Sequence, residues 1–453
     1  MATISVSFAV LGVEAFINWT SPALPHLKTE NSEIQVTDEQ GTWIASIYNL
    51  GAIAGIPLYP FIFNFTGRKQ TLLLLSVFQI ICWVMIIFAP NVETLYVARF
   101  LGGLTCQAFY KVGLTYIGEI AERKIRGSLI VISRIFARTG NLYIKTAGAL
   151  LSYRNMNILM LSTPIIFFCI FLFMPESPHF LLNRGQKTEA WKTLSKLRGT
   201  EKPEILNPDF KKMQRDITQN KNQDMFAFRK LFCVRGNRRG LFIILLTYTT
   251  SSFCGSPAIN SYTEEIFGYI DLPLEPKYSA TILAGINVCV MFFSLLLVDR
   301  MGRRVLALSS GIISTIALVT VACFFFMKLI LFIETTSCKW MVVAGFIVFT
   351  SGVEVGANTI SSVMLSELLA LDVKGTGILC ITFAGQSYDF VVRSTFLWFN
   401  SIAGIYTNFL VYAVFCFVGS LTFFFIAPET KDKSLEEIQD ILHARKSEDK
   451  ADK

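Results

Sequence analysis

Several features on which enzymes rely are scarce or missing in this sequence. Its 453 residues include only 3 His, which lie far apart, and only 16% of the residues are charged. The chain has no group of residues with metal-ligand spacing, no phosphate-binding loop, and no nucleophile with a neighbouring base. The sequence therefore predicts a protein that is not an enzyme and that uses no metal and no cofactor.

Signs of a disulfide-rich or exported protein are also missing. Most of the ten Cys lie inside apolar runs, and only Cys233 and Cys338 fall clearly in loops. This distribution gives no disulfide framework. The N-terminal segment has no basic region before its first apolar run, so we expect that run to stay in place and not to be cleaved as a signal peptide.

Apolar residues, in contrast, dominate the chain. They make up 53% of it, the mean hydropathy is +0.51, and apolar runs of about 20 residues recur along the whole length. The sequence therefore predicts an all-α polytopic membrane protein. Its twelve expected spans are 3–19, 42–63, 71–90, 95–118, 128–151, 156–174, 240–262, 279–298, 305–332, 340–366, 376–399 and 405–427.

The distribution of charge predicts the topology. Between Met174 and Gly240 there are 15 Lys or Arg against 7 Asp or Glu. The short loops on the same side of the predicted membrane are basic, whereas the loops on the opposite side are poorer in cations and some are acidic. Positive charge collects in cytoplasmic loops, so both termini are expected in the cytoplasm. The net charge of +8 is thus explained by topology and does not indicate a nucleic-acid partner.

The two halves of the chain repeat the same short motifs in the same order. The first motif is a Gly followed by two basic residues, Gly67-Arg68-Lys69 in one half and Gly302-Arg303-Arg304 in the other. The second is a Glu eight residues before a Gly, from Glu119 to Gly127 and from Glu367 to Gly375. The third is a Pro-Glu pair, Pro175-Glu176 and Pro428-Glu429. This pattern is typical of a duplicated six-helix unit. The predicted division is a first half (1–174), a partly helical cytoplasmic loop (175–239), a second half (240–427) and a cytoplasmic tail (428–453).

The fifth predicted span is unusually polar. Arg134, Arg138, Asn141 and Lys145 fall within an arc of about 60° on a helix, so they form one stripe. A charge in mid-membrane costs roughly 2.5–3.5 kcal/mol, and such residues usually face a protein interior or a water-filled cavity. We therefore expect the stripe to face the functional cavity.

Further charges lie within other predicted spans. They are Glu14, Lys111, Glu354, Asp389 and Arg393. Asp389 and Arg393 are four residues apart, so they could pair with each other. Two interpretations of all these charges stay open: contact with a solute, or an internal salt-bridge network that holds the halves together and binds nothing. In the seventh span, Gly255 and Pro257 predict a break in the helix, and such breaks in carriers usually lie at the binding site.

Longer motifs bring a family resemblance. They are Trp19-Thr20-Ser21-Pro22-Ala23-Leu24-Pro25, Tyr116-Ile117-Gly118-Glu119 with Arg126-Gly127, Pro175-Glu176-Ser177-Pro178, Asp299-Arg300-Met301-Gly302-Arg303-Arg304 and Pro428-Glu429-Thr430-Lys431. With them the chain resembles the sugar porter family of the major facilitator superfamily, and within it the insect facilitated trehalose and glucose transporters. The resemblance covers essentially the whole chain. It implies twelve helices in two pseudo-symmetric halves, transport by alternating access without a chemical reaction, and a place in the plasma membrane.

The resemblance also implies a gate at the cytoplasmic helix ends. There, acid–base pairs would lock the two halves together in one state and part in the other. The residues implied are Arg68, Glu119, Arg126, Glu176, Asp299, Arg303, Arg304, Glu367 and Glu429. The alternative is static cytoplasmic charge that only sets topology.

At the expected sugar site the chain departs from the family. Arg134 stands where a Gln is usual, Ser251 and Ser252 replace a Gln pair, and Asn287 is retained. The candidate substrate-binding residues are Arg134, Arg138, Asn141, Ser251, Ser252, Asn287, Asn358 and Gln386. Because Arg suits carboxylate and phosphate as well as hydroxyl groups, a cationic cavity also fits an organic anion.

Three functions therefore stay open. The first is a transporter of a small polar solute, a trehalose- or glucose-like sugar by resemblance. The second is a carrier of an organic anion that uses the basic stripe, with proton coupling left open through Glu14, Glu354 and Asp389. The third is a membrane sensor that keeps the carrier fold without transport. The expected partners are the solute and the lipid bilayer, and nucleic acid is not among them.

Overall fold

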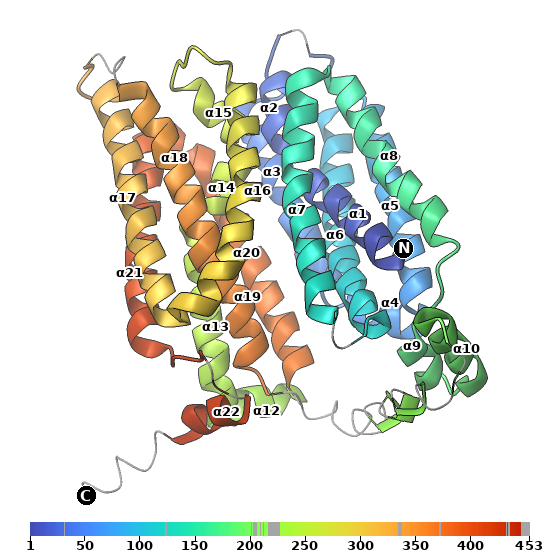
Figure 1. Cartoon of the computed structure of the whole chain (residues 1–453). Coiled ribbons are helices and arrows are strands. Elements are labelled where there is room, and N and C mark those ends of the chain that lie inside the picture. Colours follow the sequence, from blue (N-terminus) through green and yellow to red (C-terminus); the bar gives the residue numbers. More distant parts are fainter. Residues whose placement is uncertain are drawn as a thin grey trace, which may run out of the picture. The chain divides into compact units, whose positions relative to one another are not determined.

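The computed structural model describes most of the chain. It covers residues 1–30, 32–122, 125–200, 202, 206–208, 210, 211, 213–215, 227–333, 338–370, 373–431, 433 and 435–444; within these ranges the side chains at 60, 61, 63, 64, 227, 295–299, 435, 436, 443 and 444 are left out. The regular secondary structure of this described part is helical throughout (Figure 1). The predicted all-α class is confirmed.

The chain divides into two compact units, each formed from two stretches of sequence. The first comprises Met1–Trp19 and Ile47–Met225, and the second comprises Thr20–Ser46 and Phe226–Lys453. Residues 20–46 thus belong with the second unit, although they precede most of the first unit in the sequence. The long helix α3 (Asp38–Gly55) runs from the second unit into the first.

The first unit contains most helices of residues 1–174, together with two short helices of the predicted central loop. Its helices besides the end of α3 are α1 (Ala2–Ile17), α4 (Tyr59–Thr66), α5 (Arg68–Ile87), α6 (Val92–Ile120), α7 (Arg126–Leu150) and α8 (Tyr153–Phe171), followed by the short helices α9 (Pro178–Asn183) and α10 (Lys187–Arg198). The last two pack around a small core of their own, which includes Leu182, Ala190 and Leu194.

The second unit contains the rest. Its helices are α2 (Thr20–Leu27), α12 (Ala227–Cys233), α13 (Arg235–Phe253), α14 (Ser256–Ser261), α15 (Thr263–Gly268), α16 (Pro276–Met301), α17 (Arg303–Leu329), α18 (Lys339–Val353), the π-helix η3 (Glu354–Asn358), α19 (Thr359–Glu367), α20 (Lys374–Ala403), α21 (Ile405–Ile426) and α22 (Leu435–Ala444). A buried cluster that includes Leu241, Met364 and Leu442 connects α13, α19 and the C-terminal α22.

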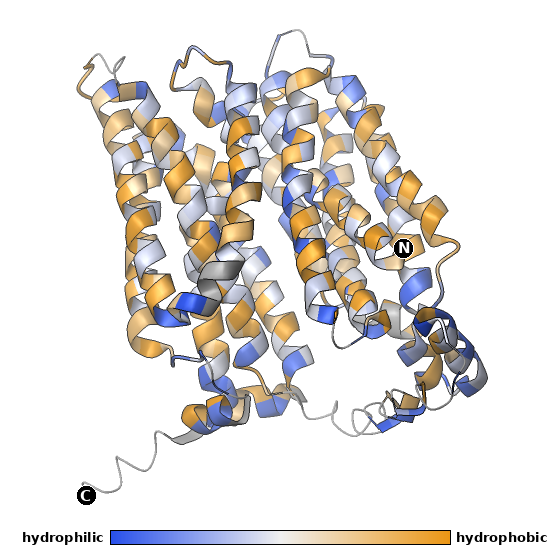
Figure 2. Ribbon diagram, viewed as in Figure 1, coloured by the Kyte–Doolittle hydropathy of each residue, from blue (hydrophilic) through white to orange (hydrophobic). Residues whose placement is uncertain are grey.

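Hydropathy separates the spans into two kinds. Within the described residues, seven helical stretches are long and apolar enough to cross a membrane; they are Ala2–Leu27, Arg68–Ile87, Tyr153–Phe171, Pro276–Ser294, Arg303–Leu329, Lys339–Glu367 and Ile405–Ile426. Figure 2 shows the hydrophobic residues along α5, α8, α17 and α21, and the hydrophilic ones on α10. The five other predicted spans are helical too, but they are interrupted or, as in α6, α7 and α20, carry charged residues.

The helix geometry changes at the end of the first predicted span and within three other spans. α1 gives way to α2 at Asn18 and Trp19, α3 gives way to α4 around Pro57, and α13 gives way to α14 at Gly255, where the last break was predicted. The tenth span contains η3. Proline explains the second interruption, because it has no N–H to continue the hydrogen bonds of the helix. The first depends on a tertiary contact that is described below.

Close helix contact in the first unit depends on two glycines. A Cβ atom at Gly51 of α3 would lie 1.9 Å from the Phe100 carbonyl oxygen, and one at Gly103 of α6 would lie 1.9 Å from the Tyr48 carbonyl oxygen. Only glycine allows the two backbones to approach so closely.

Candidate functional site

In the second unit, the broken seventh span brings predicted residues together. Gly255 adopts φ +89°, in the left-handed region that favours glycine, and the ring of Tyr412 lies against it. The break ends α13 just after Ser251 and Ser252. The Ser251 hydroxyl donates to Oδ1 of Asn358 at 2.6 Å, and the Ser252 hydroxyl donates to Oδ1 of Asp389 at 2.6 Å.

The π-helix extends this polar network. Nδ2 of Asn358 donates to Oε2 of Glu354 at 3.0 Å, and the Glu354 side chain is 9% exposed. Both residues lie in η3, whose wider turn contains one more residue than an α-turn; such turns occur often at functional sites. Five predicted residues are thus joined in two hydrogen-bonded groups at the end of α13: Ser251, Asn358 and Glu354 in one, and Ser252 and Asp389 in the other.

Two candidate amides have an unused acceptor. Oδ1 of Asn287 in α16 and Oδ1 of Asn141 in α7 are buried and have no hydrogen-bond partner among the described residues. A buried carbonyl oxygen without a donor costs about 1–3 kcal/mol, so these atoms indicate a missing donor such as water or a solute hydroxyl. Asn287 belongs to the second unit, where α16 packs against η3. Asn141 belongs to the first.

The polar stripe of the fifth span lies on α7 as predicted. Asn141 and Lys145 are buried, with 6% and 1% exposed, whereas Arg134 and Arg138 are half-buried. Gly140 packs so tightly on α1 that a Cβ atom there would lie 3.0 Å from Cβ of Glu14. The structure therefore places the acidic residue of the first span beside the basic stripe.

The remaining intramembrane candidates are more dispersed. Lys111 is half-buried in α6, and Gln386 is half-buried in α20. Arg393 is 5% exposed, and its backbone carbonyl accepts a hydrogen bond from the Tyr262 hydroxyl at 3.3 Å.

At the helix ends of the first unit, the predicted gate residues form one cluster. Arg68 and Glu119 form an ion pair at 2.9 Å, and the Ser177 hydroxyl donates to the same Glu119 carboxylate. The Glu176 carboxylate accepts from the backbone N–H groups of Arg68, at 3.0 Å, and Lys69, at 3.1 Å. It therefore caps the N-terminus of α5.

The second unit repeats this arrangement. Arg303 and Glu367 form an ion pair at 3.1 Å. The Glu429 carboxylate accepts from the backbone N–H groups of Arg303 at 2.9 Å and Arg304 at 3.0 Å, and so caps α17. The Arg304 guanidinium donates to the Phe424 carbonyl at 2.8 Å. In both units the ion pair joins helices of the same unit, so the predicted lock between the two halves stays a prediction.

The two capping carboxylates differ electrostatically. Burial raises the pKa of Glu176 and outweighs the backbone N–H groups that it accepts from. Burial also disfavours the charge of Glu429, but there the N–H groups of Arg303, Arg304, Lys431 and Thr430 prevail and lower the pKa. The second cap therefore holds its charge more firmly than the first.

Two further gate residues were predicted. Arg126 begins α7, and its Nε has no hydrogen-bond partner among the described residues. Asp299 lies in α16, and its side chain falls outside the described part.

The sequence analysis missed Arg99, which explains the interruption of the first span. Its side chain is 0% exposed in α6, and it donates to the carbonyls of Phe16 and Ile17 at the end of α1. Its guanidinium carbon also lies 5.0 Å from the ring centre of Phe16, 5.6 Å from that of Trp19 and 5.2 Å from that of Tyr48. One arginine thus binds the carbonyl end of a broken helix inside an aromatic cage.

Lys28 was also missed, although it connects three elements of the second unit. Its Nζ lies 2.6 Å from a carboxylate oxygen of Asp38 and 2.8 Å from one of Glu265. Burial opposes the ammonium, but the two carboxylates outweigh it and raise the pKa of Lys28. The signal in the sequence was a lone cation in a loop with several acids.

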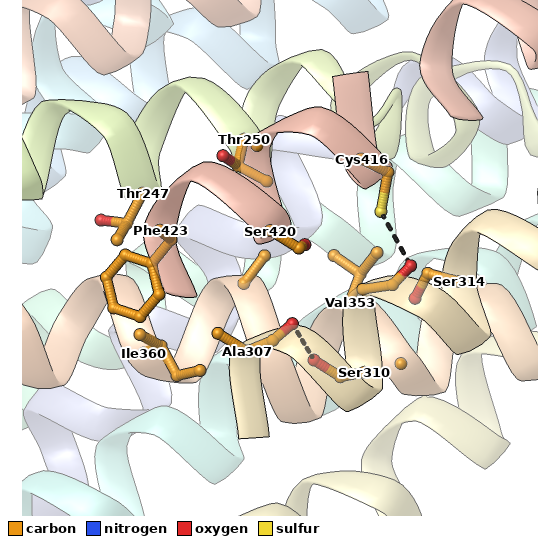
Figure 3. A pocket seen from close by; sticks show the side chains of 14 residues that line it. Thr247, Thr250, Ala307, Ser310, Ser314, Val353, Ile360, Cys416, Ser420 and Phe423 are labelled. Atoms are coloured by element: carbon orange, nitrogen blue, oxygen red, sulfur yellow. Dashed lines mark hydrogen bonds between the residues drawn. The ribbon is translucent and has the colours of Figure 1, made fainter. Parts of the chain in front are cut away.

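The second unit also has a small cavity behind η3. Its volume is about 30 Å³, and Figure 3 shows that Thr247, Thr250, Ser314 and Ser420 border it together with apolar side chains. That volume suits a single water molecule and is too small for a sugar. None of the predicted site residues lines it.

Twelve helical spans with matching charge clusters at their ends define the architecture of membrane carriers of the major facilitator superfamily. The sugar (and other) transporter family model matches residues 11–442. The chain belongs to this family. It is an integral membrane protein of a family of transporters.

Relatives agree on the same class. The chain is 29% identical over 441 residues to the facilitated trehalose transporter Tret1 of Anopheles gambiae, with 97% of this chain and 55% of that protein covered. It is also 29% identical over 449 residues to Tret1 of Polypedilum vanderplanki, where the coverage is 97% and 87%. The chain thus spans only about half the length of some curated relatives.

Solved structures share the fold. The inward open xylose transporter XylE from E. coli superposes with a TM-score of 0.79 at 18% identity, covering 97% of this chain and 98% of that one. XylE bound to 6-bromo-6-deoxy-D-glucose gives 0.75 at 17% identity, with 97% and 99% covered. The predicted two-half major facilitator fold is confirmed.

Proposed function

We propose that this protein transports a neutral sugar of the trehalose or glucose class across the plasma membrane by alternating access. Asn287 carries the proposal. It is the amide retained at a family sugar position, and its buried Oδ1 has no donor among the described residues. A sugar hydroxyl is such a donor. Family membership and the trehalose-transporting relatives support sugar over the organic anion and sensor alternatives.

The residues around Asn287 support a polar solute. Ser251 lies on α13 and Asn358 on η3, and η3 packs against both α13 and α16. In our proposal these groups exchange their mutual hydrogen bonds for bonds to sugar hydroxyls when the solute binds.

Replacing Asn287 by Ala is expected to lower uptake of labelled trehalose or glucose into proteoliposomes about tenfold, the effect of losing one well-placed hydrogen bond of about 1.4 kcal/mol. Asn155→Ala, which changes an exposed amide at the start of α8, is the matched control and should transport normally. Unchanged sugar uptake by the Asn287 variant would contradict the proposal. So would uptake of an organic anion, but not of sugar, by the unaltered protein.

We further propose that sugar transport is coupled to a proton gradient. The structural neighbours include a proton:xylose symporter, and Glu14, Glu354 and Asp389 are acidic residues within spans. Uptake that rises with an imposed proton gradient, and that loses this response in Asp389→Asn, supports coupling. Uptake that is independent of the gradient excludes it.

For orientation, we propose that both termini lie in the cytoplasm, as the basic residues between 174 and 240 indicate. Cys338 then lies on the outer side and Cys233 on the inner side. A membrane-impermeant maleimide is expected to label Cys338 in intact cells and Cys233 only after permeabilisation. Mass spectrometry of the labelled peptides identifies which cysteine has reacted. Cys338→Ser is the control for the outer signal. Labelling of Cys233 in intact cells would reverse the topology.

A further inference from the structure

The second unit has a groove that none of the predicted site residues lines. It has a volume of about 550 Å³ and runs between the start of α3 and the end of α20. Its α3 wall includes Asp38, Glu39 and Trp43, and its α20 wall includes Trp398 and Asn400. A volume in this range accommodates a small organic molecule. The position, at the end of two long helices, places it at a membrane surface.

The groove is electronegative. Asp38 and Glu39 line it, and its lining contains no Lys, Arg or His. Lys28 is shared between Asp38 and Glu265, and Arg393, which is buried, directly precedes Ser394 of the lining. The lining itself therefore carries two carboxylates and no cation, and one of these carboxylates is paired with Lys28. The C-terminus of α20 at Ala403 adds the negative end of a helix dipole, whereas the N-terminus of α3 adds the positive end of another beside Asp38 and Glu39.

The hydroxyl groups of the groove act as acceptors. Thr42 and Ser46 donate their hydrogens to backbone carbonyls of α3, at 3.0 Å and 2.8 Å. Ser394 and Ser401 do the same in α20, at 3.1 Å and 2.8 Å. Each hydroxyl oxygen then has lone pairs left over. The Asn400 amide donates to the Tyr269 hydroxyl at 3.4 Å.

Two exposed tryptophans complete the walls. Trp43 is 44% exposed and Trp398 is 57% exposed. Tryptophan near the end of a spanning helix often anchors it at the membrane interface. Here the two rings lie in a groove that also holds carboxylates. Indole faces attract organic cations, most strongly where acidic groups are nearby.

We propose that this groove binds a primary organic ammonium group, as carried by an aminoethyl phospholipid headgroup or by a free amine. Its three N–H donors match the carboxylate and hydroxyl acceptors, and its carbon atoms pack on the indole faces. Lys28 shows the same chemistry in an adjacent position, since Asp38 and Glu265 hold its ammonium. A quaternary ammonium binds less well because it has no N–H to donate.

The binding test uses the full-length protein in detergent and needs no transport assay. Saturation-transfer NMR with ethanolammonium chloride is expected to give saturable binding, with weaker binding of tetramethylammonium at the same ionic strength. Glu39→Gln and Trp398→Leu should each weaken binding by about fivefold or more. The matched controls Glu275→Gln and Trp340→Leu change an exposed acid and an exposed Trp of the same unit outside the groove, and should bind normally.

A second arm separates the two sources of the ligand. The protein is reconstituted with phosphatidylethanolamine and phosphatidylglycerol, and bound lipid is then detected by native mass spectrometry. The groove is a lipid site if only phosphatidylethanolamine stays bound and if Glu39→Gln and Trp398→Leu each lose it. Ethanolammonium binding without lipid retention identifies a free amine. The proposal is overturned if the folded protein, checked by its thermal unfolding, binds neither, or if the groove variants bind as well as the controls. Sugar transport can fail independently of either result.

Discussion

Replacing Arg99 by Met is expected to destabilise the protein by about 2–4 kcal/mol and to abolish sugar uptake. The Arg99 side chain is fully buried, and two carbonyls at the end of α1 depend on its guanidinium for donors. Met keeps most of the volume but leaves those carbonyls unpaired and removes the cation from three aromatic rings. Thermal unfolding of the purified protein measures the stability, and proteoliposome uptake measures the function.

Two further variants make the Arg99 prediction specific. Arg99→Lys keeps the charge but loses the planar fork that reaches both carbonyls, so its stability should lie between those of Met and Arg. Arg154→Met removes an exposed arginine of the same unit and should change little. Normal unfolding of Arg99→Met would show that the break between α1 and α2 does not need the buried cation.

Replacing Glu429 by Gln is expected to destabilise the protein at neutral pH by about 1 kcal/mol, whereas Glu176→Gln should be nearly neutral. The two residues cap equivalent helices, but the pKa of Glu429 is lowered and that of Glu176 is raised. The charge of Glu429 therefore stabilises the native state at neutral pH, while burial penalises the charge of Glu176. Gln removes the charge in both cases and keeps an acceptor.

The opposite pKa shifts of Glu429 and Glu176 predict how the stability of each variant depends on pH. Stabilisation by Glu429 is present above the pKa of an unfolded Glu and is lost as the pH falls through its lower native pKa. The contribution of Glu176 is present below the unfolded pKa and is lost as the pH rises through its higher native value. Thermal unfolding between pH 4 and pH 7 should therefore show the Glu429→Gln deficit shrinking with acidification. A deficit that is equal for both variants at all pH values would refute the asymmetry.

The architecture could be predicted because it depends on features that are local in sequence. Apolar runs of spanning length, basic loops and repeated Gly-Arg and Pro-Glu motifs each indicate an element or a helix end without reference to the rest of the chain. The helix break at Gly255 could be predicted for the same reason, because Gly255 and Pro257 are enough to indicate it. The end of α1 was not, because the carbonyls of Phe16 and Ile17 are bound by a residue about 80 positions away.

In the candidate site, too, some features could be predicted from the sequence and others depend on contacts between distant residues. Position in the family frame selected Ser251, Asn287 and Asn358, and the structure joins Ser251 with Asn358. Helical periodicity placed Arg134 to Lys145 on one face of α7, where Lys145 and Asn141 are buried. Helical periodicity could not reveal η3, because it assumes the same number of residues in every turn of the helix. Lys28 escaped attention because its two partners, Asp38 and Glu265, come from two separate elements, α3 and α15.

The π-helix has a consequence for how this half of the protein can change. A π-turn holds one residue more than an α-turn, so removing one residue between Glu354 and Asn358 would restore a regular helix while α18 and α19 keep the faces that they present. The wide turn that holds Asn358 against Ser251 would then be lost. In the tenth span, therefore, the length of the chain decides which side chains meet the end of α13, and a single-residue deletion can alter that choice without any substitution.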